Sequence, residues 1–278
     1  MSKLNPSDYP EAMNSLTAIS VAAANAIKGS FSPDSLRIKA DGSPVTSADE
    51  AAEGVIRDGL ARLARPLPIV SEECSDDRAL PVKSDCYYLV DPLDGTKEFI
   101  AGRNEYTINI ALMSAGCPVL GVITAPALGV IWRGIIGRGA ERLEFSSGKV
   151  LPPHPIHSRS APVGDLIVMV SRSHLDRPTE AYLKHLPHSR RIGCGSSLKF
   201  CRLAEGAADH YPRLGPTMDW DIAAGHAILT AAGGVVTELD GSNLKYGTPG
   251  LRIPSFLAWG DPERAEGRTG NSHQEARQ

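Results

Sequence analysis

The chain has 278 residues, of which 42% are hydrophobic, so it can bury a core large enough for one large or two modest domains. A formal net charge of −3, with no basic patch along the sequence, argues against a nucleic acid polymer as the partner. The five cysteines form no C-x-x-C pair and the N-terminal segment is polar, which predicts free thiols in a reducing cytoplasm and no secretory signal.

The first part of the chain predicts helices that are followed by buried strands. Asp-Gly-Ser-Pro at residues 41–44 is typical of a turn, and Thr46 or Ser47 after it can cap the next helix with its hydroxyl. The elements expected here are helices at residues 10–27 and 46–63, strands at 36–40, 67–71 and 87–90, and one helical turn at 97–100.

A stretch without formal charge extends from residue 108 to residue 132 and is long enough to span a bilayer. Pro118, Pro126 and three glycines interrupt it. We therefore interpret the stretch as three buried strands joined by turns, and we expect no transmembrane segment.

Residues 146–163 are polar and proline-rich, lie between two apolar blocks, and are the best linker candidate. Beyond them strands and helices alternate irregularly, which indicates an α/β fold with two layered halves. We expect an N-terminal half at 1–145, a C-terminal half at 146–262 and a frayed tail at 263–278. The elements expected in the second half are strands at 166–171, 235–238 and 253–259 and helices at 176–186, 196–211 and 220–232.

The strand at 87–90 runs directly into an acidic turn with the sequence Asp91-Pro92-Leu93-Asp94-Gly95-Thr96. Two carboxylates three residues apart can face one point if the chain turns sharply, and they repel each other unless a cation lies between them. Carboxylate oxygens and water are the ligands that Mg2+ prefers. The segment therefore predicts a metal site, and the alternative is an aspartate-rich turn that caps the next helix.

Two further acids occur in comparable positions. Glu72 follows the short apolar strand at 67–71, and Asp221 lies in the first turn of the helix expected at 220–232. For Asp221 the alternative is a helix-start acid that interacts favourably with the helix dipole.

Together these motifs resemble the lithium-sensitive magnesium phosphatases of the inositol monophosphatase superfamily. The acid pair after a strand, the Asp-x-x-Asp-Gly-Thr element and the Trp-Asp-x-Ala-Ala-Gly element occur in the family's order over about residues 10–260. Within the superfamily the resemblance is greatest to the 3′(2′),5′-bisphosphate nucleotidases. The segments that carry it are DPLDGTKEFI at 91–100, SRSH at 171–174, GSSLKFC at 195–201 and YPR at 211–213.

The resemblance implies a layered α/β/α/β/α sandwich with two or three Mg2+ ions between its halves. It implies that Glu72, Asp91 and the Leu93 carbonyl hold the first ion, and that Asp91, Asp94 and Asp221 hold the second. A third, weaker ion is expected near Glu72. Two metal ions can stabilise both the attacking and the leaving oxygen of an in-line displacement.

The resemblance also implies a proton path through the Thr96 hydroxyl, which Asp49 polarises. The alternative for Asp49 is a capping acid paired with Thr46 at the start of the second helix.

The predicted substrate contacts are of two kinds. Gly95 and Thr96 offer backbone N–H groups that can bind a phosphate. The glycine-containing turn at 193–197, which includes Ser196, looks similar and is expected to bind the phosphate that does not react, and the alternative is an ordinary capped helix. Lys199, Arg213 and His174 are candidates for a second, unreactive phosphate, and Asp221 is also expected to contact substrate. The alternative for the two cations is a solvated surface charge, and for His174 a hydrogen-bonding loop residue.

The resemblance implies a phosphomonoester hydrolase that converts adenosine 3′,5′-bisphosphate to AMP and phosphate by attack of a metal-activated water. In sulfur assimilation this reaction removes an inhibitory by-product. One alternative is an inositol monophosphatase or fructose-1,6-bisphosphatase on the same scaffold, and another is a non-catalytic metal- or nucleotide-binding protein. The expected location is the cytoplasm, with peripheral association with the inner membrane left open.

Overall fold

A large mixed sheet forms the centre of the first half of the chain. The computed structural model describes residues 4–30, 35–40, 42–74, 84–173, 175–186 and 188–269. The sheet has eight strands in the order β10-β8-β7-β6-β5-β4-β3, with β9 paired to β8. All its pairs are antiparallel except β3 with β4, which are parallel. The strands are β3 (Ile69–Ser71), β4 (Cys86–Asp94), β5 (Thr107–Ser114), β6 (Cys117–Ala125), β7 (Val130–Ile135), β8 (Gly139–Ser146), β9 (Lys149–Val150) and β10 (His154–Ile156).

A smaller sheet belongs to the second half of the chain. Its five strands are in the order β12-β11-β13-β17-β15. They are β11 (Leu166–Ser171), β12 (Ser189–Cys194), β13 (His210–Arg213), β15 (Val235–Thr237) and β17 (Phe256–Trp259). Two short strand pairs form separate two-stranded sheets, β1 (Arg37–Ile38) with β2 (Pro44–Val45) and β14 (Thr217–Met218) with β16 (Arg252–Ile253).

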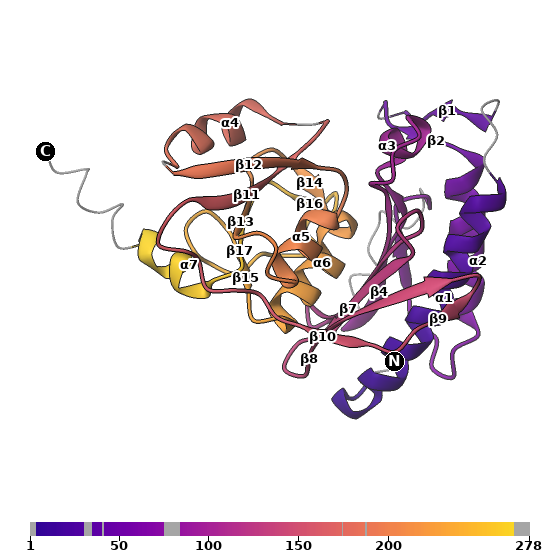
Figure 1. Ribbon diagram of the computed structural model, residues 1–278. Coiled ribbons are helices and arrows are strands. Elements are labelled where there is room, and N and C mark those ends of the chain that lie inside the picture. The colour runs from indigo at the N-terminus through magenta and orange to yellow at the C-terminus, as the bar shows by residue number, and fades with distance from the viewer. Residues whose placement is uncertain are drawn as a thin grey trace, which may run out of the picture.

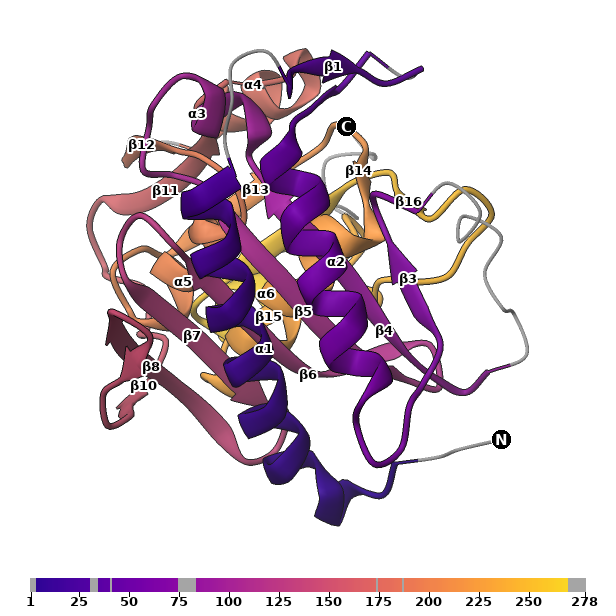
Figure 2. The same ribbon diagram turned by 90° about the vertical axis from the view of Figure 1, so that its right-hand side faces the viewer.

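Helices lie on both faces of each sheet. Helices α1 (Tyr9–Ser30) and α2 (Ser47–Ala61) lie side by side across the outer face of the large sheet (Figure 2). Between the sheets lie α5 (Leu198–Ala204) and α6 (Asp219–Ala231), and beyond the small sheet lie α4 (Arg177–Lys184) and α7 (Pro262–Thr269) (Figure 1). This arrangement is the predicted α/β/α/β/α sandwich. The turn η1 (Pro6–Asp8) precedes α1, and the one-turn helix α3 (Thr96–Ile100) follows β4.

The uncharged stretch at 108–132 forms strands β5, β6 and the start of β7, as predicted. Alternate residues of β5 point to opposite faces of the sheet. Ile108, Ile110 and Leu112 pack under α1 and α2, while Ala111 and Met113 pack toward α6 and the small sheet. Both faces are therefore apolar, which explains the lack of charge. Among the helices in the described residues, none is long and apolar enough to cross a membrane.

Helix α6 approaches the large sheet closely because small residues face each other. A Cβ added to Gly121 of β6 would lie 2.3 Å from the Ala224 carbonyl oxygen, and one added to Gly225 would lie 2.4 Å from the Phe200 ring. The sequence Ala223-Ala224-Gly225 therefore allows α6 to wedge between β6 and α5, which fixes the position of its N-terminus.

The predicted helix at 196–211 is wrong beyond Ala204. The chain leaves α5 at Gly206, which has a φ of 71°, and then forms β13. A left-handed glycine is a common helix C-terminus, but the apolar spacing that continues past it, through Ala208, predicts a longer helix than the one observed.

One other expectation needs correction. The predicted linker at 146–163 contains β9 and β10, and β10 is the edge strand of the large sheet. The tail expected at 263–278 begins within α7, and 270–278 lie outside the described part of the chain, so its fraying stays a prediction. Strands β8, β12 and β13 were not expected from the sequence. The division into halves at 145/146 stays a prediction.

Candidate active site

Three elements bring carboxylates together at one edge of the large sheet. Strands β3 and β4 are parallel, so the chain leaves both at the same edge, and the N-terminus of α6 reaches this edge from between the sheets. One carboxylate oxygen each from Glu72, Asp91 and Asp221 lies within 4.8 Å of the other two. The fold thus brings these three acids together although they are up to 149 positions apart in the sequence.

The acidic turn owes its shape to an irregularity in β4. The register against β5 shifts between Asp91 and Asp94. In a regular strand, residues three apart point to opposite faces, and a bulge changes this. Asp91 and Asp94 consequently line the same cavity, together with Leu93.

Asp94 has its own partners. Its Oδ2 accepts a hydrogen bond of 2.6 Å from the Ser197 backbone N–H and one of 3.4 Å from the Asn109 amide. Ser197 in turn hydrogen-bonds through its hydroxyl to Asn109 Oδ1 at 2.7 Å and to Thr107 Oγ1 at 2.8 Å. Sequence reasoning missed Asn109 and the backbone donor of Ser197.

Burial and mutual repulsion raise the pKa values of the carboxyl groups in this cluster. Burial raises the pKa of Glu72 to about 7, although the charge of Lys39 opposes this. Burial and the Asp221 carboxylate raise the pKa of Asp94 to about 6. Burial raises the pKa of Asp91 well above its usual range, and Glu72 and Asp94 raise it further. A bound cation would offset this repulsion.

The cluster fits a hard divalent cation. Asp91 is 1% exposed, and its Oδ2 has no hydrogen-bond partner among the described residues, while its Oδ1 accepts from the Leu93 N–H at 3.0 Å. A buried carboxylate oxygen without a donor is costly unless a cation binds it. Three carboxylates with oxygen donors only are the ligand set that suits Mg2+ rather than a softer metal.

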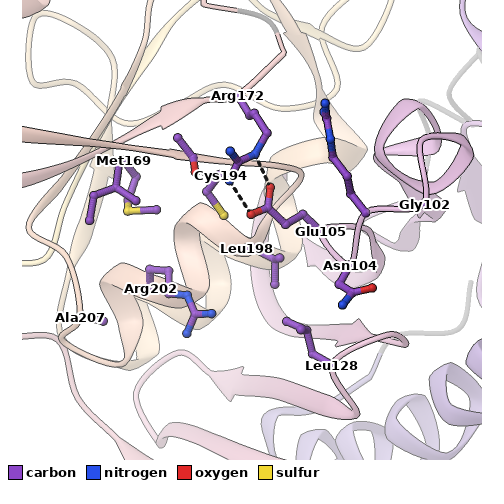
Figure 3. A pocket seen from close by; sticks show the side chains of 13 residues that line it. Gly102, Asn104, Glu105, Leu128, Met169, Arg172, Cys194, Leu198, Arg202 and Ala207 are labelled. Atoms are coloured by element: carbon purple, nitrogen blue, oxygen red, sulfur yellow. Dashed lines mark hydrogen bonds and ion pairs between the residues drawn. The ribbon is translucent and has the colours of Figure 1, made fainter.

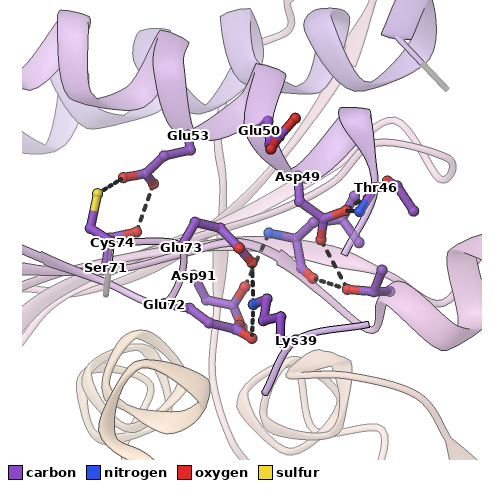
Figure 4. A network of polar contacts seen from close by, with 12 residues as sticks. Lys39, Thr46, Asp49, Glu50, Glu53, Ser71, Glu72, Glu73, Cys74 and Asp91 are labelled. Atoms are coloured by element: carbon purple, nitrogen blue, oxygen red, sulfur yellow. Dashed lines mark hydrogen bonds and ion pairs between the residues drawn. The ribbon is translucent and has the colours of Figure 1, made fainter. Parts of the chain in front are cut away.

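Lys39 is a member of the site that the sequence did not reveal. Its ammonium group contacts Glu72 at 2.9 Å and Glu73 at 2.7 Å (Figure 4). It follows β1, in a polar stretch where no pattern singles out one lysine. A third ion near Glu72 would share that carboxylate with Lys39.

Asp49 uses its two carboxylate oxygens for different purposes. Its Oδ2 accepts hydrogen bonds from the Thr46 backbone N–H at 2.8 Å and the Thr46 hydroxyl at 2.7 Å, which caps α2 (Figure 4). Its Oδ1 lies 3.0 Å from the Thr96 hydroxyl, which also lies 3.1 Å from the Leu93 carbonyl oxygen. The capping position and the contact with Thr96 therefore occur together and do not exclude each other.

The turn before α5 presents polar groups to the cavity. Ser196 has a φ of 47°, and its buried hydroxyl makes no hydrogen bond within the described chain. Gly95 has a φ of 92° and begins α3, and a Cβ added there would lie 3.4 Å from the Ser196 side chain. The two predicted phosphate turns thus lie against each other.

The two predicted cations are more buried than surface charges. Lys199 is 3% exposed and donates to the carbonyl oxygens of Cys194 and Ser196. Its ammonium group lies 5.2 Å from the centre of the Tyr211 ring. Arg213 donates to the Pro216 carbonyl oxygen at 3.2 Å. Burial works against its charge, but Tyr211 and Asp221 raise its pKa above the usual value.

One cavity of about 230 Å3 contains most of the predicted site. Asp49 does not line the cavity but contacts Thr96, which does. His174 lies outside the described residues. The predicted residues that line the cavity are Glu72, Asp91, Leu93, Asp94, Gly95, Thr96, Ser196, Lys199, Arg213 and Asp221.

A second, larger cavity has a volume of about 860 Å3. Figure 3 shows it between the loop that carries Gly102 and Asn104 and the side chains of Met169 and Arg202. It contains no part of the acidic cluster, so its size does not make it the reaction site. Arg172 and Cys194 line both cavities.

Comparison with known proteins agrees with this geometry. The sequence profile described as the inositol monophosphatase family matches residues 10–276. The chain belongs to the inositol monophosphatase family. This result confirms the resemblance found in the sequence.

Relatives within the inositol monophosphatase family are similar over most of their length. The 3′(2′),5′-bisphosphate nucleotidase CysQ of Shigella flexneri is 44% identical over 224 residues, which cover 78% of this chain and 88% of the relative. The CysQ protein of Escherichia coli strain K12 is 42% identical over 229 residues, with the same coverage of 78% and 88%. The crystal structure of CysQ from Bacteroides thetaiotaomicron superimposes with a TM-score of 0.78 and 35% identity, covering 90% of this chain and 97% of that one.

Proposed function

We propose that the protein is a magnesium-dependent phosphatase that converts adenosine 3′,5′-bisphosphate to AMP and phosphate. The observation that carries the proposal is a single cavity in which an acidic cluster lies together with two cationic side chains, Lys199 and Arg213. The acids suit a metal ion and a reacting phosphate, and the cations suit a second phosphate. The similarity to CysQ nucleotidases supports a nucleotide as the carrier of both phosphates.

Glu72, Asp91 and the Leu93 carbonyl oxygen would hold one Mg2+ ion, and Asp91, Asp94 and Asp221 a second one. The ions would lower the pKa of the attacking water and offset the charge of the phosphoryl group. The buried, unpartnered Oδ2 of Asp91 supports its assignment to both ions. A third ion would compete with Lys39 for Glu72.

Thr96 and Asp49 form the proposed route for the proton. The Thr96 hydroxyl can donate to Asp49 Oδ1 at 3.0 Å, which leaves the lone pairs of its oxygen free to accept a hydrogen bond from the attacking water. Asp49 Oδ2 is already saturated by two donors from Thr46, so Oδ1 is the oxygen directed to Thr96. The pair would orient the water and take up its proton.

The phosphates would be bound from two sides. The reacting phosphate would accept hydrogen bonds from the N–H groups of Gly95 and Thr96. The sequence predicts Ser196 at the unreactive phosphate, but its side chain lies against Gly95, so we assign its hydroxyl, which has no partner in the described structure, to the reacting phosphate as well. Arg213 and Lys199 would bind the second phosphate, and His174 stays a further candidate for this role.

The cellular role follows from the same proposal. Removal of adenosine 3′,5′-bisphosphate would serve sulfur assimilation in the cytoplasm. The five cysteines, each in the described part of the chain, form no disulfide there, which agrees with a reducing compartment.

The proposal is tested by comparing substrates. We would measure kcat/KM for phosphate release from adenosine 3′,5′-bisphosphate, inositol 1-phosphate and fructose 1,6-bisphosphate, with Mg2+ and with a chelator. We expect the nucleotide to be preferred over inositol 1-phosphate, which has no second phosphate, by at least about tenfold, since a charge-assisted contact contributes that much. The Asp221→Asn variant, purified in parallel, shows whether any activity comes from a contaminating phosphatase.

The alternatives predict different results. Preference for inositol 1-phosphate or fructose 1,6-bisphosphate would assign the protein to one of those activities. Tight binding of the nucleotide in calorimetry without phosphate release would favour the non-catalytic alternative.

Lithium sensitivity belongs to the same proposal. Li+ is close to Mg2+ in size but has half the charge, so it could occupy a metal site after phosphate transfer and slow product release. We expect LiCl to inhibit phosphate release at concentrations at which NaCl has no effect. Equal inhibition by both salts at matched ionic strength would contradict this expectation.

A further inference from the structure

An ion pair between Glu105 and Arg172 connects the two halves of the site. Glu105 lies just before β5 of the large sheet, and Arg172 follows β11 of the small sheet. Two parallel hydrogen bonds of 2.7 Å join them, from Nε to Oε2 and from Nη2 to Oε1 (Figure 3). The bidentate geometry fixes the direction of both side chains, which a single contact would not.

The same two side chains also hold the backbone of residues 193–195. Arg172 Nη2 donates to the Gly193 carbonyl oxygen at 2.7 Å, and the Gly195 N–H donates to Glu105 Oε2 at 2.9 Å. A Cβ added to Gly195 would lie 2.7 Å from the Glu105 carbonyl oxygen. The turn is therefore pressed against the loop that carries Glu105.

This turn leads directly into groups of the candidate active site. Ser196 presents its unpartnered hydroxyl, and the Ser197 N–H donates to Asp94 Oδ2 at 2.6 Å. Lys199 donates to the carbonyl oxygens of Cys194 and Ser196, so its position also depends on the turn. A shift of residues 193–195 would move a phosphate ligand, a partner of Asp94 and a cation together.

The ion pair is poorly suited to stabilising the fold. The Arg172 side chain is 42% exposed and that of Glu105 27%, and pairs this exposed contribute little to stability. The hydrogen bonds from Arg172 lower the pKa of Glu105, so the carboxylate stays ionised at neutral pH. Because the pair is well oriented but adds little stability, its role is better explained by the position that it gives to the backbone of residues 193–195.

We propose that Glu105 and Arg172 are positioning residues that hold the turn at 193–197 at the distance from the acidic cluster that the substrate phosphates require. They act through the backbone of Gly193 and Gly195, which they hold by hydrogen bonds, and Arg172 also lines the candidate active-site cavity. The inference rests on the proposed phosphatase function for its effect on catalysis, but not for its effect on the turn.

The first test compares graded substitutions on adenosine 3′,5′-bisphosphate. Glu105→Ala and Arg172→Ala should lower kcat/KM on the order of 10- to 100-fold, the cost of a misplacement near 1 Å. Glu105→Gln should lose less, because its amide oxygen can still accept from the Gly195 N–H. Arg172→Lys should resemble Arg172→Ala, because lysine cannot donate two parallel bonds.

A matched control and the melting temperature separate position from stability. Glu144→Gln breaks another exposed Arg–Glu pair, Arg142 with Glu144 at 3.0 Å, and should change kcat/KM by no more than about twofold. The melting temperature of each Glu105 and Arg172 variant should change by less than about 4 °C. If kcat/KM falls across the variants in proportion to the fall in melting temperature, the pair has a structural role and the proposal is overturned.

A double-mutant cycle tests whether Glu105 acts through the turn. Ser196→Ala should cost much less in the Glu105→Ala background than in the wild-type chain, because the hydroxyl is already misplaced. Equal costs in both backgrounds would mean that Glu105 does not act through Ser196.

Hydrogen exchange tests the turn without any substrate. The amides of residues 193–199 should exchange faster in Glu105→Ala than in the wild-type chain, while those of β5 should not change. Unchanged exchange at 193–199 would overturn the proposal whatever the substrate is. Faster exchange in a protein that does not hydrolyse the nucleotide would leave the positioning inference intact and refute only the proposed function.

Discussion

At the scale of single residues, the site depends on side chains whose two polar atoms do different things. Asp49 caps α2 with one oxygen and meets Thr96 with the other. Asp221 accepts hydrogen bonds from the Thr217 hydroxyl and the Met218 N–H with its Oδ2, which caps α6, and is also within the acidic cluster. For both acids the local capping interpretation and the functional one are compatible, because a carboxylate has two oxygens.

Asp91→Asn should abolish activity without unfolding the chain. The amide has one neutral oxygen and an NH2 group in place of two anionic oxygens, so it cannot bridge two cations. Activity should fall below about 1% of wild type, as expected when an essential charge-stabilising group is removed. Without Mg2+ the variant should melt no lower than the wild type, because the substitution removes a buried charge that Glu72 and Asp94 repel. Steady-state rates and melting curves in a chelator check both statements, and activity above that limit at saturating Mg2+ would contradict the bridging role.

Arg213→Ala should lose activity selectively on the bisphosphate. A charge-assisted contact with phosphate contributes roughly 1.5–3 kcal/mol, on the order of 10- to 150-fold in kcat/KM. Inositol 1-phosphate has no second phosphate, so its slow hydrolysis should change little.

Lys199→Ala should differ from Arg213→Ala. Because Lys199 also holds the carbonyl oxygens of Cys194 and Ser196, its loss should reduce kcat/KM on both substrates. Equal behaviour of the two variants would contradict this distinction, and no loss in either would mean that neither cation binds the second phosphate.

At the scale of elements, glycine contacts decide where the helices lie. Gly225 allows α6 to meet Phe200 of α5, whereas Gly54 in α2 has no atom within 4 Å of an added Cβ. The same residue type therefore has opposite consequences in two helices.

Gly225→Ala should destabilise the protein, and Gly54→Ala should stabilise it. Overpacking against Phe200 costs about 1–3 kcal/mol. Alanine at an open helical position adds roughly 0.5–1 kcal/mol by restricting the unfolded chain. Denaturant unfolding of the two variants beside the wild type measures both effects, and a shift in the same direction would refute the packing argument.

At the scale of the whole molecule, the acidic cluster links stability to pH and to metal. The pKa values of Glu72 and Asp94 rise on folding from 4.5 and 3.8 to about 7 and about 6, and that of Asp91 rises in the same direction. Between pH about 4 and pH about 7 the folded protein therefore holds protons that the unfolded chain has released. Folding stability should fall as the pH rises through this window.

Metal-free protein should accordingly melt lower at pH 7.5 than at pH 5. The loss should be on the order of 3 kcal/mol, or roughly 5–10 °C for a chain of this size. Because Mg2+ binds ionised carboxylates, it should raise the melting temperature more at pH 7.5 than at pH 5. Melting curves at both pH values, with Mg2+ and with a chelator, check this, and Asp91→Asn should reduce the pH dependence. A metal-free protein equally stable at both pH values would contradict the raised pKa values.

The sequence by itself determined the acidic cluster, the layered fold and the family. Hydrophobic runs ending in acids mark strand ends, and Asp91, Asp94 and Thr96 lie within one short motif, so their relation is local and visible along the chain. The uncharged run at 108–132 likewise indicated strands buried on both faces.

Only the tertiary structure decided the partners of these residues. The contact of Lys39 with Glu72, the Ser197 N–H on Asp94 and the Glu105–Arg172 pair join segments 33, 103 and 67 positions apart. A backbone donor has no sequence signature, and one lysine or arginine in a polar loop resembles every other. The helix that stops at Ala204 shows the same limit. The apolar spacing continues past Ala204 and predicts a longer helix, but there the chain returns to the small sheet and forms β13. These features depend on where distant segments meet, which is fixed by the close packing of α6 between the sheets and not by any local pattern.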